Sequence, residues 1–87
     1  MNVYVVMSWS ARAGAKCVGL NMNERSARNM AERAVEEYID FSGCDGYPAN
    51  NEGGTEFWPE NAEGDFRVRI ETKKVFINFA NSERANA

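Results

Sequence analysis

The feature that most limits the fold is a run of small and apolar residues at helical spacing in the middle of the chain. Apolar residues recur three, four, seven, eight and eleven positions after Ala27, which places them on one stripe of an α-helix: Ala27, Met30, Ala31, Ala34, Val35 and Tyr38. Asn23 is a suitable N-cap, and Ser42-Gly43 is typical of a helix end. The three alanines allow the helix backbone to lie close to a sheet. The sequence therefore predicts one helix after Asn23, packed against β-strands.

Four segments have the alternation and the β-branched and aromatic residues typical of strands, namely residues 3–9, 15–22, 66–72 and 75–79. A short connection containing Gly14 joins the first two, and Lys73-Lys74 joins the last two, so each pair is predicted to form an antiparallel hairpin. Residues 43–65 hold five glycines and both prolines and are predicted to be a long loop. An additional short strand at 55–58 is the alternative.

The fold class expected from these elements is α+β, a four-stranded antiparallel sheet in ββαββ order with one helix on one face. With 87 residues the chain is expected to be a single domain, residues 1–80, followed by a polar, flexible tail, residues 81–87.

One helix covers one face of such a sheet, so the other face is expected to be open. Alternation assigns Val3, Val5, Met7 and Trp9, with Val18, Leu20 and Met22, to the covered face. The open face is then predicted to carry Tyr4, Val6, Cys17, Arg67, Arg69, Glu71, Phe76 and Asn78.

The composition argues against most catalytic and metal chemistry. The chain has no histidine and two cysteines, Cys17 and Cys44, so the usual zinc ligand sets and the His-based catalytic arrangements are missing from its sequence. We expect no enzyme activity, no cofactor and no metal. The two thiols are expected to be reduced, because no secretion signal precedes them; a Cys17–Cys44 disulfide is the alternative.

Charge is segregated along the chain. Residues 42–65 carry six acidic and no basic residues, whereas residues 67–87 carry five basic and two acidic ones. Aromatic residues lie within the acidic segment, and exposed aromatic residues flanked by acids are typical of a surface that binds a basic protein partner. The predicted partner-binding residues are Tyr47, Glu52, Glu56, Phe57, Trp58, Glu60 and Glu63. The alternative for Phe57 and Trp58 is that both pack against the core.

The open sheet face provides a second candidate site. Aromatic rings among arginines on a sheet are typical of platforms for single-stranded nucleic acid, with Tyr4, Arg67, Arg69 and Phe76 as the candidate residues. Nucleic acid is the less favoured partner, because the net charge is −3. Apolar residues on this face also suggest a homodimer.

Residues 18–34, VGLNMNERSARNMAERA, form a strand that runs through a polar cap into a helix. This segment, about a fifth of the chain, and the overall layout resemble small phage-encoded proteins, including anti-CRISPR proteins built as a hairpin, a helix and a second hairpin. The resemblance implies a non-enzymatic inhibitor that occupies a surface of a larger, often nucleic-acid-binding, complex. No binding residues carry over from it, since those proteins share no binding motif.

No apolar run is long enough for a membrane helix, and the first residues lack the basic start of a signal peptide. We therefore expect a cytoplasmic protein, in a bacterial host if it is phage-encoded, with no membrane partner.

Overall fold

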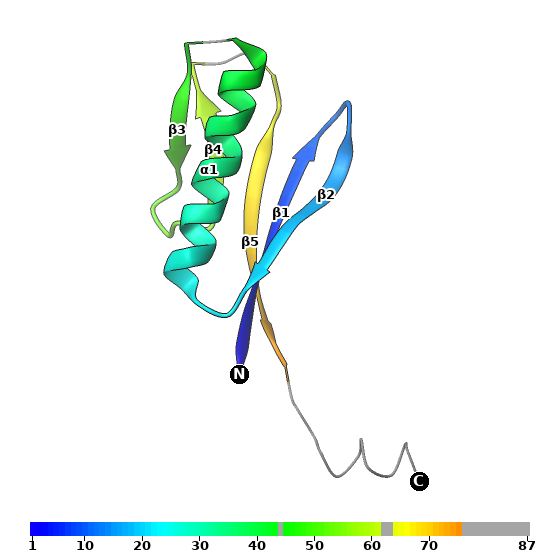
Figure 1. Cartoon of the computed structure of the whole chain (residues 1–87), viewed down its shortest axis with the longest axis vertical. Coiled ribbons are helices and arrows are strands. Elements are labelled where there is room, and N and C mark those ends of the chain that lie inside the picture. Colours follow the sequence, from blue (N-terminus) through cyan, green and yellow to red (C-terminus); the bar gives the residue numbers. More distant parts are fainter. Residues whose placement is uncertain (44, 62–63, 76–87) are drawn as a thin grey trace, which may run out of the picture.

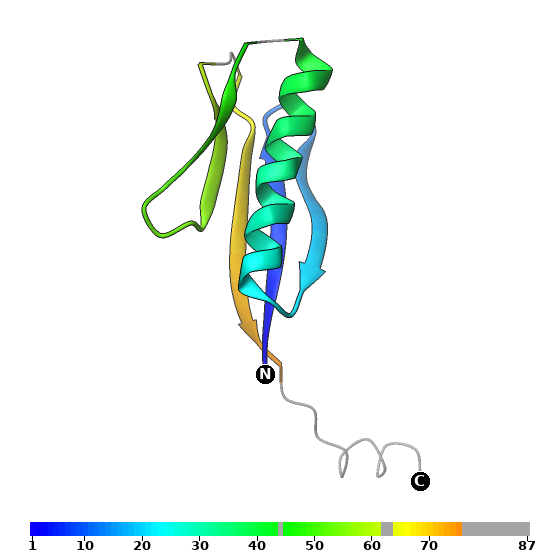
Figure 2. The same ribbon diagram turned by 60° about the vertical axis from the view of Figure 1, so that its left-hand side comes forward.

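One helix packs on one face of an antiparallel sheet. The computed structural model describes residues 1–43, 45–61 and 64–75. Along the chain these residues form β1 (Asn2–Ser10), β2 (Gly14–Asn21), α1 (Glu24–Ser42), β3 (Tyr47–Asn50), β4 (Glu56–Glu60) and β5 (Arg67–Lys74). The strands lie in the order β2-β1-β5-β4-β3, and every neighbouring pair is antiparallel (Figure 1). In Figure 2, α1 runs along the strands in front of the sheet. The predicted α+β class is confirmed.

The number of strands was predicted wrongly, because the described residues form a sheet of five strands rather than four. The segment predicted to be a long loop contains the hairpin of β3 and β4, and β4 matches the alternative of an extra strand near residues 55–58. Lys73 and Lys74 do not form a connection, since they are the last two residues of β5. Apart from Val75, the predicted strand 75–79 lies outside the described residues, as does the predicted tail 81–87.

Both ends of α1 have the chemistry that the sequence predicts. The Asn23 side-chain oxygen accepts a hydrogen bond from the backbone N–H of Ser26 at 3.1 Å. At the other end Gly43 adopts the left-handed conformation, and its N–H donates to the Ile39 carbonyl at 3.0 Å. The buried part of the helix is Ala27, Ala31, Val35 and Ile39, with Met30 and Ala34 packed around it. The apolar stripe is therefore the core-facing side of the helix.

The two faces of β1 were assigned the wrong way round. Val6 pairs with Ile70 across the sheet, and paired residues on neighbouring strands point to the same face. Ile70 faces α1, as predicted, so Val6 is completely buried beneath the helix and Tyr4 packs beside it. The alternate residues of β1 consequently lie on the open face: Val3, Val5, Met7 and Trp9. Because β1 is apolar on both sides, its alternation alone could not select the core side.

A β-bulge explains why Leu20 of β2 was also assigned to the wrong face. The register passes from Val6 opposite Gly19 to Met7 opposite Cys17, so Val18 has no counterpart on β1. On one side of the bulge Cys17 shares the open face with Met7, as predicted. On the other side Leu20 pairs with Val5 and also lies on the open face, contrary to the prediction. The extra residue reverses the alternation between these positions.

The hairpin of β3 and β4 is closed by Asn51 and fastened to the helix by Arg28. The Asn51 side-chain oxygen accepts from the backbone N–H groups of Thr55 and Glu56 at 2.9 and 3.0 Å. Gly54 in the same turn is buried and has φ of 66°, and a Cβ at that position would lie 3.0 Å from the Arg28 guanidinium. Arg28 also pairs with Glu24 at 2.6 Å. Arg28 therefore packs against the turn.

Two valines next to each other in sequence test the orientation of β1. Val6→Ala should lower the free energy of unfolding by about 2 kcal/mol, because it empties a fully buried site. Val5→Ala, on the open face, should cost less than half as much. Urea unfolding measures both values. Equal costs, or a larger cost for Val5→Ala, would contradict the orientation of β1.

Neighbouring asparagines test the β3–β4 turn. Asn51→Ala removes the acceptor of two backbone N–H groups, one exposed and one half-buried. It should lower the free energy of unfolding by about 1–2 kcal/mol, because a typical hydrogen bond contributes about 0.5–1.5 kcal/mol net. Asn50→Ala is the control, since the Asn50 side chain makes a single exposed hydrogen bond to the Asn51 carbonyl. Similar unfolding midpoints for the two variants would show that Asn51 does not hold this turn.

The open sheet face as a candidate binding site

The face of the sheet opposite α1 carries a broad, mixed surface, here called the open face. The strand registers place on it residues from all five strands. Its members include Val5, Met7, Trp9, Ala15, Cys17, Leu20, Tyr47, Glu56, Trp58, Glu60, Arg67, Arg69, Glu71 and Lys73. Side chains on β1 and β2 are mostly apolar, whereas those on β4 and β5 are mostly charged.

The apolar half has large side chains in contact with solvent. Trp9 is 48% exposed although it lies in β1, a strand with neighbours on both sides. Leu20 on β2 is exposed as well. Cys17 is an exposed free thiol beside Met7. An exposed tryptophan within a sheet is the kind of residue that supplies binding energy at interfaces.

The charged half of the open face, on β4 and β5, carries two pairs of opposite charge. Arg69 contacts the Glu56 carboxylate at 3.4 Å, and Lys73 lies 3.7 Å from Glu71. These groups are well exposed, so each pair contributes little to stability. They place charges of both signs close together on this half of the face.

The two indoles of the chain flank Arg67. Arg67 is the cross-strand partner of Trp9, and its guanidinium carbon lies 5.6 Å from the ring centre of Trp58. The Trp58 ring nitrogen donates to Glu60 at 2.6 Å, which fixes the orientation of the indole. Among the described residues no carboxylate lies within ion-pair distance of Arg67. Arg67 is thus held by an aromatic ring while its charge remains available.

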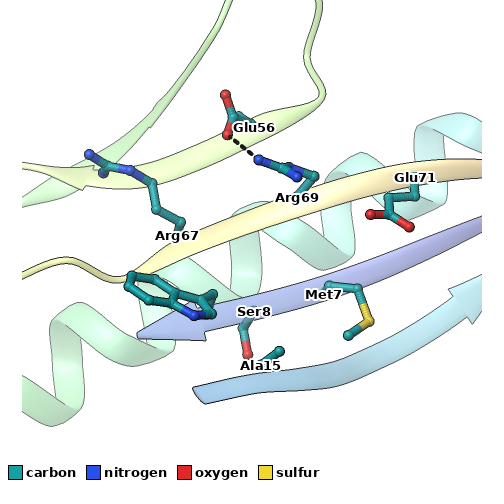
Figure 3. Close-up of a pocket in the computed structure, with 8 residues that line it drawn as sticks. Met7, Ser8, Ala15, Glu56, Arg67, Arg69 and Glu71 are labelled. Carbon is teal, nitrogen blue, oxygen red and sulfur yellow. Dashed lines mark hydrogen bonds and ion pairs between the residues drawn. The ribbon is translucent and has the colours of Figure 1, made fainter. Parts of the chain in front are cut away.

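A hollow of about 390 Å³ lies where the two halves meet. Figure 3 shows Met7 and Ala15 on one side of it and Arg69 paired with Glu56 on the other. The full lining is Met7, Ser8, Trp9, Ala15, Glu56, Arg67, Arg69 and Glu71. An apolar floor with a few placed charges favours a ligand that brings both an apolar group and a polar one.

The structure brings together residues that the sequence assigned to two different sites. Glu56, Trp58, Glu60 and Tyr47, predicted to be part of a binding loop, lie on the same face as Arg67 and Arg69, predicted for the sheet site. The β3–β4 hairpin causes this, because it adds the supposed loop to the sheet.

Other predicted site residues lie elsewhere. Phe57 is 4% exposed and packs in the core, which confirms for this ring the alternative that it packs against the core. Tyr4 packs under α1, so it is not part of the open face. Glu52 is exposed in the β3–β4 turn. Glu63 and Phe76 lie outside the described residues, as does Asn78, which was also predicted for the open face.

Trp9, Met7 and Ala15 were missed as surface residues. The sequence contains no signal that would have placed Trp9 outside the core, because aromatic residues in strands are usually buried. Only its pairing with Arg67, a residue from the far end of the chain, shows that it faces solvent.

One large exposed residue lies away from the open face. Phe41, near the end of α1, is 93% exposed. Within the described ranges no cluster of Cys, Asp or Glu is placed to hold a metal ion. No helix of the described chain combines the length and the apolar character needed to cross a membrane.

A double-mutant cycle tests the contact between Arg67 and Trp58. The coupling free energy between Arg67→Ala and Trp58→Leu should be about 0.5–1 kcal/mol, the usual size of an exposed cation–π contact. The matched cycle of Lys73→Ala with Trp58→Leu should give a coupling near zero. Equal coupling in the two cycles would mean that the ring does not hold Arg67.

Comparisons with known proteins do not indicate a function for the open face. No protein-family model matches the chain, and no curated protein and no solved structure matches it. What the open face does is therefore inferred from its own geometry.

Proposed function

We propose that this chain is a non-enzymatic interaction protein that binds another protein through the open face. The observation that carries the proposal is the exposed Trp9 beside Arg67, at the rim of a hollow with an apolar floor. Tryptophan and arginine are the side chains most enriched among residues that dominate binding energy. Their placement on a sheet stabilises the geometry of the site before a partner arrives.

The charge balance favours a protein partner over nucleic acid. The open face carries three basic residues, Arg67, Arg69 and Lys73, and three acidic ones, Glu56, Glu60 and Glu71. Two of the basic groups already contact carboxylates. A phosphate backbone would meet these acids, whereas a protein can present complementary charges to both signs.

Acidic groups on the β3–β4 side support a partner with a basic surface. Glu60 lies on the open face next to Trp58, with Tyr47 opposite it on β3. Together with Glu52 in the turn, they give this side of the molecule the acidic and aromatic character that the sequence predicts.

A narrower form of the proposal follows from the layout of the chain. Hairpin, helix and hairpin occur in this order, as in the small phage-encoded inhibitors that the sequence resembles, and a further strand follows. On this basis the chain acts in the cytoplasm of a bacterial host, where it blocks a surface of a larger nucleic-acid-binding complex.

Single-stranded nucleic acid is the second candidate ligand, supported by one specific arrangement. Arg67 lies between two indoles, and aromatic rings with an arginine form a stacking platform for bases.

Capture experiments with matched variants test the proposal. Tagged protein is incubated with a bacterial lysate, and captured proteins are quantified by mass spectrometry. Trp9→Ala and Arg67→Ala should each reduce the captured partner at least tenfold, the usual effect at a dominant binding residue. Phe41→Ala, at an even more exposed aromatic residue on the helix, should leave capture unchanged.

Capture that survives both open-face variants, or that is lost with Phe41→Ala, would contradict the proposal. Fluorescence anisotropy with single-stranded RNA and DNA at low and moderate salt tests the second candidate. Binding that weakens steeply with salt and with Arg67→Ala would favour nucleic acid over protein.

A further inference from the structure

The outer edge of β2 is exposed in a way that the opposite edge of the sheet is not. Within the described residues no strand lies beyond β2, which has eight residues and no proline (Figure 1). The other edge strand, β3, has four residues and contains Pro48, which cannot donate to a further strand. An unprotected edge presents backbone N–H and C=O groups that can pair with another strand.

Apolar side chains accompany these backbone groups. Val18, Leu20 and Met22 are 38%, 62% and 62% exposed, at alternate positions along the strand and just past its end. Residues 17–22 contain no charged residue. Native edge strands are usually protected by charges or proline, so an uncharged apolar edge is typical of an interface.

The bulge restricts where a second strand can pair. Val18 is the extra residue, so the edge is regular on its C-terminal side, through Gly19, Leu20 and Asn21. Pairing centred on residues 19–21 avoids Lys16, the one charged residue of β2, and leaves Val18, the bulge residue, and Met22, just past the strand, at its two ends.

We propose that the occupant of this edge is a second copy of the chain, with the two β2 strands antiparallel about a two-fold axis at Leu20. In this register Leu20 lies opposite Leu20 of the other copy, and Val18 lies opposite its Met22. Each exposed apolar residue of the edge then gains an apolar cross-strand neighbour, which is the unit of stabilisation in a sheet. Gly19 lies opposite Asn21, so no bulky pair forms on the helix side.

The segment is therefore complementary to itself, which is why a second copy fits it better than an unrelated strand. Isologous contacts of this kind are the commonest route to a dimer. The product is a continuous ten-stranded sheet with two open faces on one side. This inference concerns the edge of β2, whereas the proposed function concerns the open face, and it stands without that proposal. Leu20 belongs to both surfaces.

Sedimentation over a range of concentrations tests dimer formation directly. The full chain should shift from a mass of 9.8 kDa towards twice that value as its concentration rises. Leu20→Arg should weaken association at least tenfold and leave the urea unfolding midpoint of the monomer unchanged, because Leu20 is exposed in the single chain. Val75→Arg, at an exposed apolar residue beyond the end of β5, should associate like the parent.

Cysteine cross-linking tests the register. In a background of Cys17→Ser and Cys44→Ser, Leu20→Cys should form a disulfide-linked dimer under mild oxidation. Residues directly opposite in an antiparallel pair have Cα atoms about 4.5–5.5 Å apart, within the range that a disulfide spans. Lys16→Cys is the control, because in this register two such cysteines lie about 26 Å apart.

A chain that stays monomeric at all concentrations, or a dimer insensitive to Leu20→Arg, would overturn the proposal. Equal cross-linking of the two cysteine variants would overturn the register. A monomeric chain overturns the dimer whatever Leu20→Arg does to lysate capture, because Leu20 also belongs to the open face. Loss of capture with Trp9→Ala alone bears on the proposed function and leaves the dimer unaffected.

Discussion

The pairing of β1 with β5 determines the rest of this structure. It joins the first strand of the chain to the last described one, with eight residue pairs from Asn2 opposite Lys74 to Trp9 opposite Arg67. A shift by one residue would exchange the buried and exposed sets of β1, because side chains alternate between faces. The observed register buries Val6 with Ile70 and leaves Trp9 beside Arg67. The core and the candidate site are thus two results of one long-range pairing.

The segment between α1 and β5 belongs to the sheet because it contributes a hairpin, and this changes the meaning of its acidic residues. Glu56 contacts Arg69 across the sheet, and Glu60 accepts from the Trp58 indole. Acidic side chains that would repel one another in a free loop instead have partners within the sheet, an arginine for Glu56 and an indole for Glu60. Arg28 is a cation near the N-terminus of α1, where the helix dipole disfavours positive charge. It nevertheless packs on Gly54 and pairs with Glu24. The hairpin is therefore stabilised from both the helix and the sheet.

The width of a single helix explains why so much apolar surface stays exposed. An α-helix with its side chains is about 10 Å across, whereas five strands at about 4.8 Å spacing are about twice as wide. Residues between α1 and the sheet, such as Val35 of the helix and Val68 of β5, are completely buried. The far side of β2 and the whole open face are not covered. The proposed partner and the proposed second copy occupy these two uncovered regions. Dimer formation through β2 would place two open faces on one side of the sheet, which favours binding to a partner with repeated sites.

By itself the sequence determined the elements that depend on neighbouring residues. The stripe from Ala27 to Tyr38, the Asn23 cap and the Gly43 end predict α1 correctly. The contrast between Val68 and Arg69 predicts the faces of β5 correctly. Helical and strand periodicity are local properties, so neighbouring residues suffice for both. Tertiary structure decided three other features. It placed Trp9 on the open face, included Glu56 in the sheet and left Leu20 exposed. Each depends on a strand register, a bulge or a partner from a distant segment, and an apolar strand such as β1 has no local feature that shows which face will be covered.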